Sequence, residues 1–193
     1  MKKMTQRKLV TLAMLAGLSI VLMYLVRFPI IPAASFLEYD MADVPILIGT
    51  FLFGPAGGLI LVAIVSVIQG VTVSAASGWI GIVMHMIATG SFVIVAGLVY
   101  KWVQTRKGAV WGLVMGSLAM TGIMIPLNLI FTVMFLGVPY DAVVAMLWPA
   151  IIPFNLLKAG INSALTFFVY KPVSKVMRLE KKDGVLMKET ANN

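Results

Sequence analysis

Long apolar segments separated by short intervals rich in proline, glycine or charge dominate the pattern of the chain. A helix that crosses a membrane needs about 20 mainly apolar residues. The pattern predicts six such helices, over residues 9–26, 44–53, 59–73, 79–103, 108–137 and 149–170. We therefore expect an all-α integral membrane protein with six transmembrane helices in one bundle. This membrane domain would occupy residues 1–178, followed by a charged cytoplasmic tail at 179–193.

The second segment is the shortest of the six. Starting near Met41, its helix would span only about 20 Å at 1.5 Å per residue. Gly54-Pro55-Ala56-Gly57-Gly58 after it predicts a sharp reversal. The alternative is a re-entrant hairpin over residues 42–73, with its backbone hidden inside the protein. Both interpretations leave the two termini on the same side of the membrane.

Composition agrees with a membrane protein. The 193 residues are 61% hydrophobic and 11% charged, with no cysteine and a mean hydropathy of +1.02. A soluble domain is about 25% charged. These values exclude a soluble enzyme, a disordered chain and a disulfide scaffold.

The net charge of +8 comes mainly from basic residues on one side of the predicted bundle, where they set its orientation in the membrane. Thirteen of the 15 basic residues precede the first segment, lie between the fourth and fifth, or follow the sixth: Lys2, Lys3, Arg7, Lys8, Lys101, Arg106, Lys107, Lys171, Lys175, Arg178, Lys181, Lys182 and Lys188. The positive-inside rule places that side, and with it both termini, in the cytoplasm. We expect contact with membrane lipid and no binding of nucleic acid.

Polar side chains converge at one depth of the predicted bundle. Lys158 and Asn128 each lie about 13 Å below the outer surface, counting 1.5 Å per residue from the helix ends. Asn155, His85 and Gln69 lie nearer that surface. Intramembrane polar groups suggest function by default. The pattern predicts an outward-facing pocket rather than a continuous pore.

The sixth segment carries the strongest signal for this pocket. Asn155, Lys158 and Asn162 have i, i+3, i+7 spacing and share one helical face. These residues have a functional interpretation, as ligand contacts, and a structural one. In the structural interpretation the asparagines cross-link helices, and Lys158 pairs with Glu38 or Asp40. We favour function for Lys158 and Asn155, weigh the two interpretations equally for Asn128, and favour structure for Asn162.

The interval at 28–43 is long, apolar and ends in three acids. It is interpreted either as a lid over the pocket or as a loop lying on lipid headgroups, and we favour the lid.

Small residues mark two further helix faces. Gly108-x-x-x-Gly112-x-x-x-Gly116 predicts close packing inside the bundle. Ala13-x-x-x-Gly17 on the first helix fits either internal packing or contact with another subunit.

Several kinds of chemistry are missing from the sequence. A single histidine cannot form a histidine metal cluster, no acidic pair lies within a span, and no phosphate-binding Gly-Lys-Ser/Thr loop is present. Ser77 near His85 has no orienting acid in the pattern. No buried carboxylate relay is expected. These features predict a binding protein, not an enzyme, that requires neither a metal nor a cofactor.

Two segments resemble a known family. Phe36-Leu-Glu-Tyr-Asp-Met-Ala-Asp43 after the first helix and Phe51-Leu-Phe-Gly-Pro-Ala-Gly-Gly58, within six short helices, are similar to the riboflavin-specific substrate-binding (S) subunit of energy-coupling factor (ECF) transporters. The resemblance runs from the first helix to the sixth. In that family the motif on the first helix is usually Ala-x-x-x-Ala, and Gly17 stands here at its second position.

The resemblance implies a vitamin-capture subunit in a bacterial cell membrane. It also implies association with a transmembrane coupling (T) subunit and two cytoplasmic ATPases, with Ala13 and Gly17 at the subunit interface. Riboflavin would be bound as the transported substrate. Three alternatives remain: an S subunit for another vitamin or vitamin precursor, a small intramembrane enzyme, and an assembly protein.

Asn128, Asn155 and Lys158 suit a flavin chemically. Each amide can donate and accept hydrogen bonds along the pyrimidine edge, and Lys158 can donate to a ring carbonyl or hydroxyl group. Glu38, Tyr39 and Asp40 would meet the polyhydroxyl tail or seal the site. Gln69, His85 and Asn162 are further candidate substrate-binding residues.

Overall fold

The computed structural model describes the backbone of residues 6–191, and the side chains of Ala33, Lys171 and residues 174–191 lie outside the described part. The side chains of the predicted tail, 179–193, and the first two basic residues, Lys2 and Lys3, therefore lie outside the described residues.

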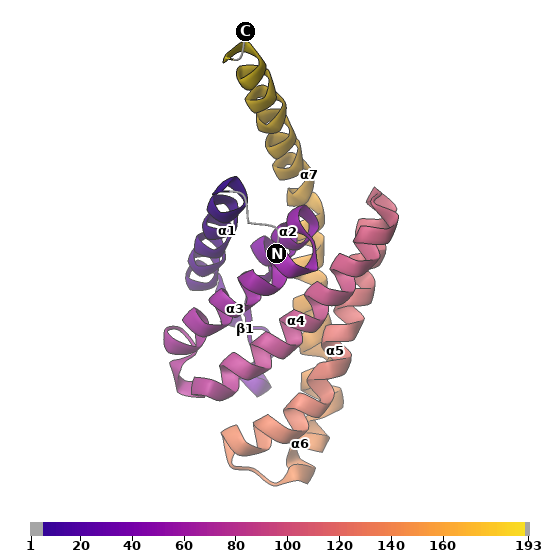
Figure 1. Cartoon of the computed structure of the whole chain (residues 1–193). Helices are drawn as coiled ribbons and strands as arrows, with labels where there is room; N and C mark the ends of the chain where they lie inside the picture. The colour runs from indigo at the N-terminus through magenta and orange to yellow at the C-terminus, as the bar shows by residue number, and fades with distance from the viewer. Residues whose placement is uncertain (1–5, 192–193) are drawn as a thin grey trace.

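Helices make up almost all of the structure (Figure 1). In chain order the elements are α1 (Gln6–Leu25), β1 (Arg27–Pro29), η1 (Pro32–Ala34), β2 (Glu38–Asp40), α2 (Asp43–Phe53), α3 (Pro55–Val71), η2 (Ala75–Ser77), α4 (Gly78–Val103), α5 (Arg106–Leu136), α6 (Tyr140–Met146), η3 (Leu147–Ile151) and α7 (Ile152–Ala191).

Helix α2 lies at the centre of the bundle, because α1, α3, α4 and α7 all pack against it. Ile46, Leu47 and Ile48 have almost no exposed surface. A helix that is apolar on every side is stable only when other elements surround it. Its central position therefore explains why this short segment carries no polar face.

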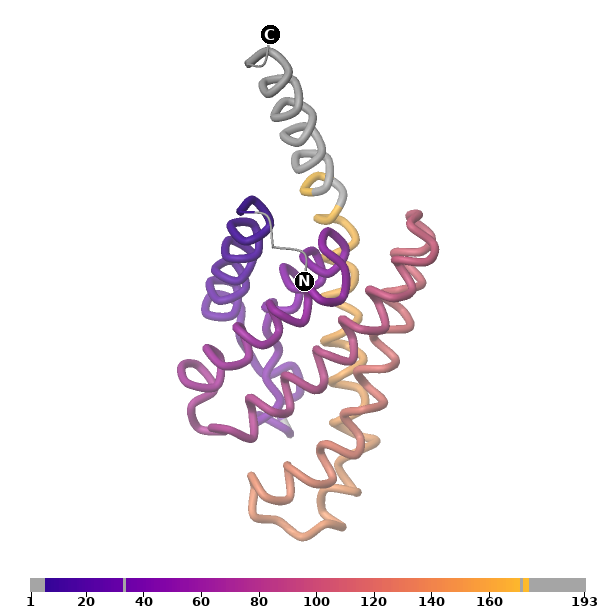
Figure 2. The backbone as a smooth tube through the Cα atoms, in the orientation of Figure 1, coloured from indigo at the N-terminus to yellow at the C-terminus, as the bar shows by residue number. Residues whose placement is uncertain are grey.

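The predicted reversal after α2 is confirmed. Gly54 has φ +79°, a conformation that side chains disfavour, and α3 starts directly at Pro55. Helix α5 then packs against both α4 and α7, and α1 lies at the opposite edge of the bundle (Figure 2).

The glycines of α5 produce the close packing expected of them. A Cβ atom added at Gly112 would lie 2.8 Å from the carbonyl oxygen of Ala96, and one at Gly116 would collide with the ring of Phe92. The absence of side chains at these positions lets α5 approach α4 closely.

Four helices in the described part of the chain are long and apolar enough to cross a membrane: Gln6–Leu25, Ala75–Val103, Arg106–Leu136 and Tyr140–Tyr170. Two shorter apolar helices, Asp43–Phe53 and Pro55–Val71, correspond to the second and third predicted spans. All six apolar segments are thus helical, and four have the length of a full span.

The interval after α1 contains structure that the all-α prediction did not include. Strands β1 and β2 form an antiparallel pair in the register Arg27↔Asp40, Phe28↔Tyr39 and Pro29↔Glu38. Leu37 and Tyr39 pack with Val143, Ile151 and Phe154 in a separate apolar cluster. The segment is thereby held against α6, η3 and α7.

The start of the last long helix is distorted next to its prolines. Leu147–Ile151 forms a π-helical turn that contains Pro149, and the regular helix α7 follows. Proline lacks the amide hydrogen needed for regular helical hydrogen bonding. Turns of π-helix often occur at functional sites. This wider turn leads directly to Asn155 and Lys158.

Candidate functional site

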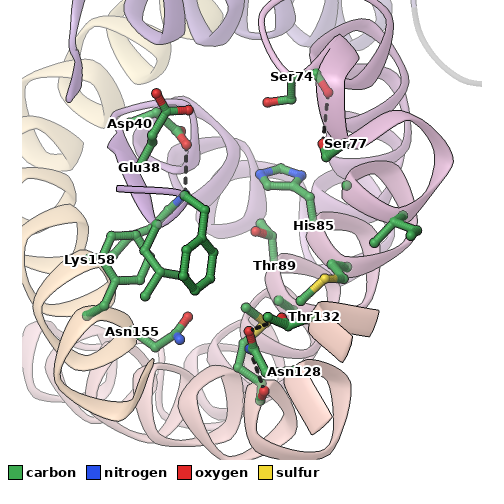
Figure 3. Close-up of a pocket in the computed structure, with 18 of the residues that line it drawn as sticks. Glu38, Asp40, Ser74, Ser77, His85, Thr89, Asn128, Thr132, Asn155 and Lys158 are labelled. Atoms are coloured by element: carbon green, nitrogen blue, oxygen red, sulfur yellow. Dashed lines mark hydrogen bonds and ion pairs between the residues drawn. The ribbon is translucent and has the colours of Figure 1, made fainter. Parts of the chain in front are cut away.

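An open cavity of about 870 Å³, counting the open space at its mouth, lies next to β2 and the two residues before it (36–40), which we call the β2 segment. Helices α3, α4, α5 and α7 form the rest of its lining. The polar residues that line it are Arg27, Glu38, Asp40, Gln69, Ser74, Ser77, His85, Thr89, Asn128, Thr132, Asn155 and Lys158. Figure 3 shows many of these side chains around the cavity.

The predicted convergence of polar side chains is present in the structure. Gln69, His85, Asn128, Asn155 and Lys158 come from four helices and all line this cavity. The helices thus bring together side chains that are distant along the chain, as the numbers of Gln69 and Lys158 show.

Lys158 forms an ion pair with Asp40. Its Nζ lies 2.7 Å from Asp40 Oδ2, and the two residues are only 7% and 3% exposed. Asp40 Oδ1 also accepts a hydrogen bond of 3.0 Å from the backbone amide of Ala42. A buried charge needs such compensation. The partner expected in the structural interpretation is therefore Asp40, and the pair connects the β2 segment to α7.

Tyr39 and Asn162 lie outside the cavity lining and support its wall. The Tyr39 hydroxyl donates to Asn162 Oδ1 at 2.9 Å, and burial raises the pKa of Tyr39 to about 12. Asn162 Nδ2 donates to the carbonyl oxygen of Asp40 at 3.2 Å and to Asp43 Oδ2 at 3.3 Å. These bonds fit the structural role favoured for Asn162.

Arg27, which the sequence analysis did not single out as a candidate site residue, also lines the cavity. Its Nε donates to Glu38 Oε2 at 2.8 Å, and the same carboxylate contacts Nη2. The paired strands β1 and β2 bring the two residues together. With the Lys158–Asp40 pair, this leaves the lining with two cations and two carboxylates, a charge balance that suits an uncharged polar ligand.

Asp43 is a buried carboxylate that the sequence analysis did not single out as a candidate site residue. It is fully buried at the first turn of α2, where it accepts a bond of 3.0 Å from Thr89 Oγ1 and lies 3.5 Å from His85 Nε2. An acid at a helix N-terminus is favoured by the helix dipole. The position of Asp43 at a helix start could be predicted from the sequence. Its burial could not, because Thr89 and His85, which lie next to it, are distant along the chain.

His85 also has a serine neighbour, but it is not Ser77. His85 Nδ1 lies 2.7 Å from Ser66 Oγ, and Asp43 lies near the other ring nitrogen, so an acid is within reach after all. Ser66 is fully buried and is not among the residues that line the cavity. A nucleophile must reach its substrate, so this trio holds the histidine ring in place instead.

Asn128 and Asn155 do not cross-link helices through hydrogen bonds among the described residues. Asn128 Nδ2 donates to Met124 O at 2.7 Å and Asn155 Nδ2 to Ile151 O at 2.8 Å, both bonds local along the chain. Thr132 donates to Asn128 Oδ1, whereas Asn155 Oδ1 is buried without a partner in the described part of the chain. Buried polar atoms rarely remain unpaired, so this oxygen is free to accept a further hydrogen bond from a group in the cavity.

Ala13 and Gly17 lie apart from this site on the outer face of α1. Both are exposed, and a Cβ atom added at Gly17 would meet no atom within 4 Å. Met14 beside them is 70% exposed. Unlike the glycines of α5, this small-residue face is not used for packing within the described chain.

Proteins with similar sequences are transporters. The chain is 32% identical over 186 residues to the riboflavin transporter RibU of Streptococcus thermophilus, covering 89% of this chain and 84% of the relative. It is 31% identical over 180 residues to the riboflavin transporter FmnP of Bacillus subtilis, covering 88% and 94%.

A solved structure, described as that of the S component of a bacterial ECF transporter, superposes with a TM-score of 0.77 at 27% identity. The match covers 89% of this chain and 97% of that one. Residues 7–170 match the family described as the ECF transporter, substrate-specific component. The chain therefore belongs to the family of substrate-specific components of ECF transporters.

Proposed function

We propose that this protein captures riboflavin in the cavity between the β2 segment and α7, as the S subunit of an ECF transporter. The observation that carries the proposal is the cluster of Asn128, Asn155 and Lys158 on one wall of that cavity, in a chain similar to proteins named riboflavin transporters.

The chemistry of the cavity supports a flavin ligand. The pyrimidine edge of the ring alternates donors and acceptors, which the amides of Asn128 and Asn155 can match. Met120, Met124 and Phe154 supply apolar surface for the ring faces. Burial of such surface contributes about 25 cal/mol per Å². Riboflavin carries no net charge, in accord with the paired charges of the lining.

The β2 segment would act as a lid. Glu38 and Asp40 line the cavity, while the Lys158–Asp40 pair and the Tyr39–Asn162 hydrogen bond fasten the segment to α7. Lys158 then has two tasks, because it holds the closed lid and faces the ligand. Opening of the segment would separate these partners and widen the mouth.

The membrane arrangement follows from helix order and charge. We place all six apolar helices in the bilayer, with both termini in the cytoplasm and the cavity facing outward. The central, enclosed position of α2 supports membrane insertion of the short α2–α3 hairpin, because lipid-exposed polar backbone would be unfavourable.

The transport step requires partners. The sequence carries no phosphate-binding loop, so we assign ATP hydrolysis to two cytoplasmic ATPases connected through a T subunit. The exposed small-residue face of α1 around Ala13 and Gly17 would contact this module. We assign no catalytic residue and no cofactor, since riboflavin is cargo.

Mass spectrometry of the small molecule that co-purifies with the native protein tests the proposal. We expect riboflavin, and a yellow protein. A different vitamin or vitamin precursor would leave the S-subunit assignment standing and overturn the substrate. Absence of any bound molecule, together with no response to added riboflavin, would contradict vitamin capture altogether.

A further inference from the structure

The cavity has two polar walls of different chemistry. Helices α5 and α7 present the amides and the ammonium group discussed above. Figure 3 shows His85 and Ser77 on the side opposite Lys158 and Asn155. We name this opposite side the α3–α4 wall, and it consists of Gln69, Ser74, Ser77 and His85.

Two buried atoms of the α3–α4 wall have no hydrogen-bond partner among the described residues: Gln69 Oε1 and His85 Nε2. The imidazole ring is held by Ser66 Oγ, 2.7 Å from Nδ1. Its Nε2 lies 3.5 Å from Asp43 Oδ1, too far for a good hydrogen bond. The wall therefore presents the unpaired oxygen of Gln69 and an imidazole nitrogen whose contact with Asp43 is long.

We propose that the α3–α4 wall binds the polyhydroxyl chain of the flavin, and that Gln69 and His85 select ligands that carry such a chain. This inference rests on the proposed function and adds which part of the ligand each wall recognises. It gives these two residues a role in specificity, whereas the opposite wall recognises the ring.

The placement of the polar groups favours a flexible chain over a ring edge. Gln69 comes from α3, Ser74 and Ser77 from η2 and the residue before it, and His85 from α4. The four side chains are thus spread over three elements. A flat heterocycle needs partners near one plane, whereas a chain with a hydroxyl on successive carbons can rotate to meet separate groups.

Hydroxyl chemistry also matches these two atoms of the wall. Gln69 Oε1 only accepts, and His85 Nε2 donates or accepts according to the tautomer that Ser66 selects. A hydroxyl group can do both, so it satisfies either state of the histidine. Met84, Met120 and Met124 also line the cavity and offer adaptable apolar contact for the ring faces.

Comparison of riboflavin with lumiflavin tests this assignment. Lumiflavin has the same ring with a methyl group in place of the polyhydroxyl chain. Fluorescence titration of the purified protein gives Kd for each ligand, and the ratio of lumiflavin Kd to riboflavin Kd measures recognition of the chain. The variants are Gln69→Leu and His85→Phe, with His85→Gln as the variant that retains a hydrogen-bonding group.

We expect Gln69→Leu and His85→Phe each to lower this ratio by at least about threefold, through weaker riboflavin binding and nearly unchanged lumiflavin binding. His85→Gln should keep the ratio closer to the native value than His85→Phe does. Asn155→Ala is the matched control, because loss of a ring contact should weaken both ligands alike and leave the ratio unchanged.

A ratio that changes less than about threefold in either variant would overturn the inference, including the case in which both flavins weaken equally. If His85→Phe does not fold, Gln69→Leu decides alone, since the oxygen that it removes has no partner among the described residues. Native protein that fails to bind riboflavin would instead overturn the proposed function, and this inference with it.

Discussion

At one end of the bundle, polar side chains from the β2 segment and four helices surround a cavity, whereas at the other end three aromatic rings close against one another. The first region, the pocket half, contains Lys158, Asp40 and the asparagines. The second, the closed half, contains the ring of Phe51, whose centroid lies 4.7 Å from that of Tyr100 and 5.3 Å from that of Tyr170.

Polar groups serve different purposes in the two halves. In the closed half the hydroxyls of Tyr100 and Tyr170 lie 2.7 Å apart and satisfy each other. In the pocket half, four lining residues each carry a buried atom without a hydrogen-bond partner in the described part of the chain: Arg27, Gln69, His85 and Asn155. Ser19 and Thr166 also carry such an atom, but they do not line the cavity. The comparison indicates that one half is closed by its own side chains and the other is completed by a ligand.

The largest effect on binding is expected from Lys158→Ala. It removes a donor from the cavity and leaves Asp40 buried without its counter-ion, so riboflavin affinity should fall by about a hundredfold in a fluorescence titration.

The double variant Lys158→Met with Asp40→Asn separates the two tasks of Lys158. It removes both charges, and the asparagine introduced by Asp40→Asn could still accept the Ala42 amide bond, so the lid should remain fastened better than in Lys158→Ala. We expect thermal stability to recover and affinity to stay low. Recovery of native affinity would show that Lys158 holds the lid and does not contact the ligand.

Asn155→Ala should have the next largest effect, a loss of about tenfold in riboflavin affinity. Among the described residues its amide nitrogen donates only to the local backbone carbonyl of Ile151, so the fold should be little affected. The check is the same titration beside a thermal unfolding curve. Unchanged affinity would remove Asn155 from the ligand site.

Tyr170→Phe in the closed half should change riboflavin affinity by less than about twofold. It removes the hydroxyl contact with Tyr100 and should lower stability by about 0.5–1.5 kcal/mol. A loss of affinity as large as that of Asn155→Ala, measured on folded protein, would contradict the division into two halves.

Ala13→Leu and Gly17→Leu should leave riboflavin binding unchanged and prevent assembly, because both residues are exposed on α1 and outside the cavity lining. Co-purification with tagged ATPases measures assembly. A matched control is Met14→Ala, which makes an exposed neighbour smaller. Normal recovery of the ATPases with both leucine variants would contradict the proposed subunit interface.

The sequence could predict the convergence of polar side chains because depth in a helix is a simple count of residues. Asn128 and Lys158 were placed at one depth by that count, and the folded helices bring both to one cavity. The sequence predicted internal packing for the glycines of α5 but left two interpretations open for Ala13 and Gly17. Only the fold distinguishes Gly112, which touches α4, from Gly17, where an added Cβ would touch nothing within 4 Å.

The details of the lid required the structure. The pairing of β1 with β2 alternates side chains across the strand, so Glu38 and Asp40 face the cavity while Tyr39 between them faces Asn162. Three-residue strands leave too little periodicity to predict this. Arg27 and Asp43 were missed for a related reason, since their partners are brought close only by folding.

Fluorescence titration of the purified native protein with riboflavin, with Asn155→Ala measured in parallel, tests the central claim most directly. The account predicts saturable quenching by the native protein and affinity about tenfold lower for the folded variant. Saturable quenching that is identical in both proteins would place riboflavin elsewhere, and no quenching by the native protein would contradict riboflavin capture.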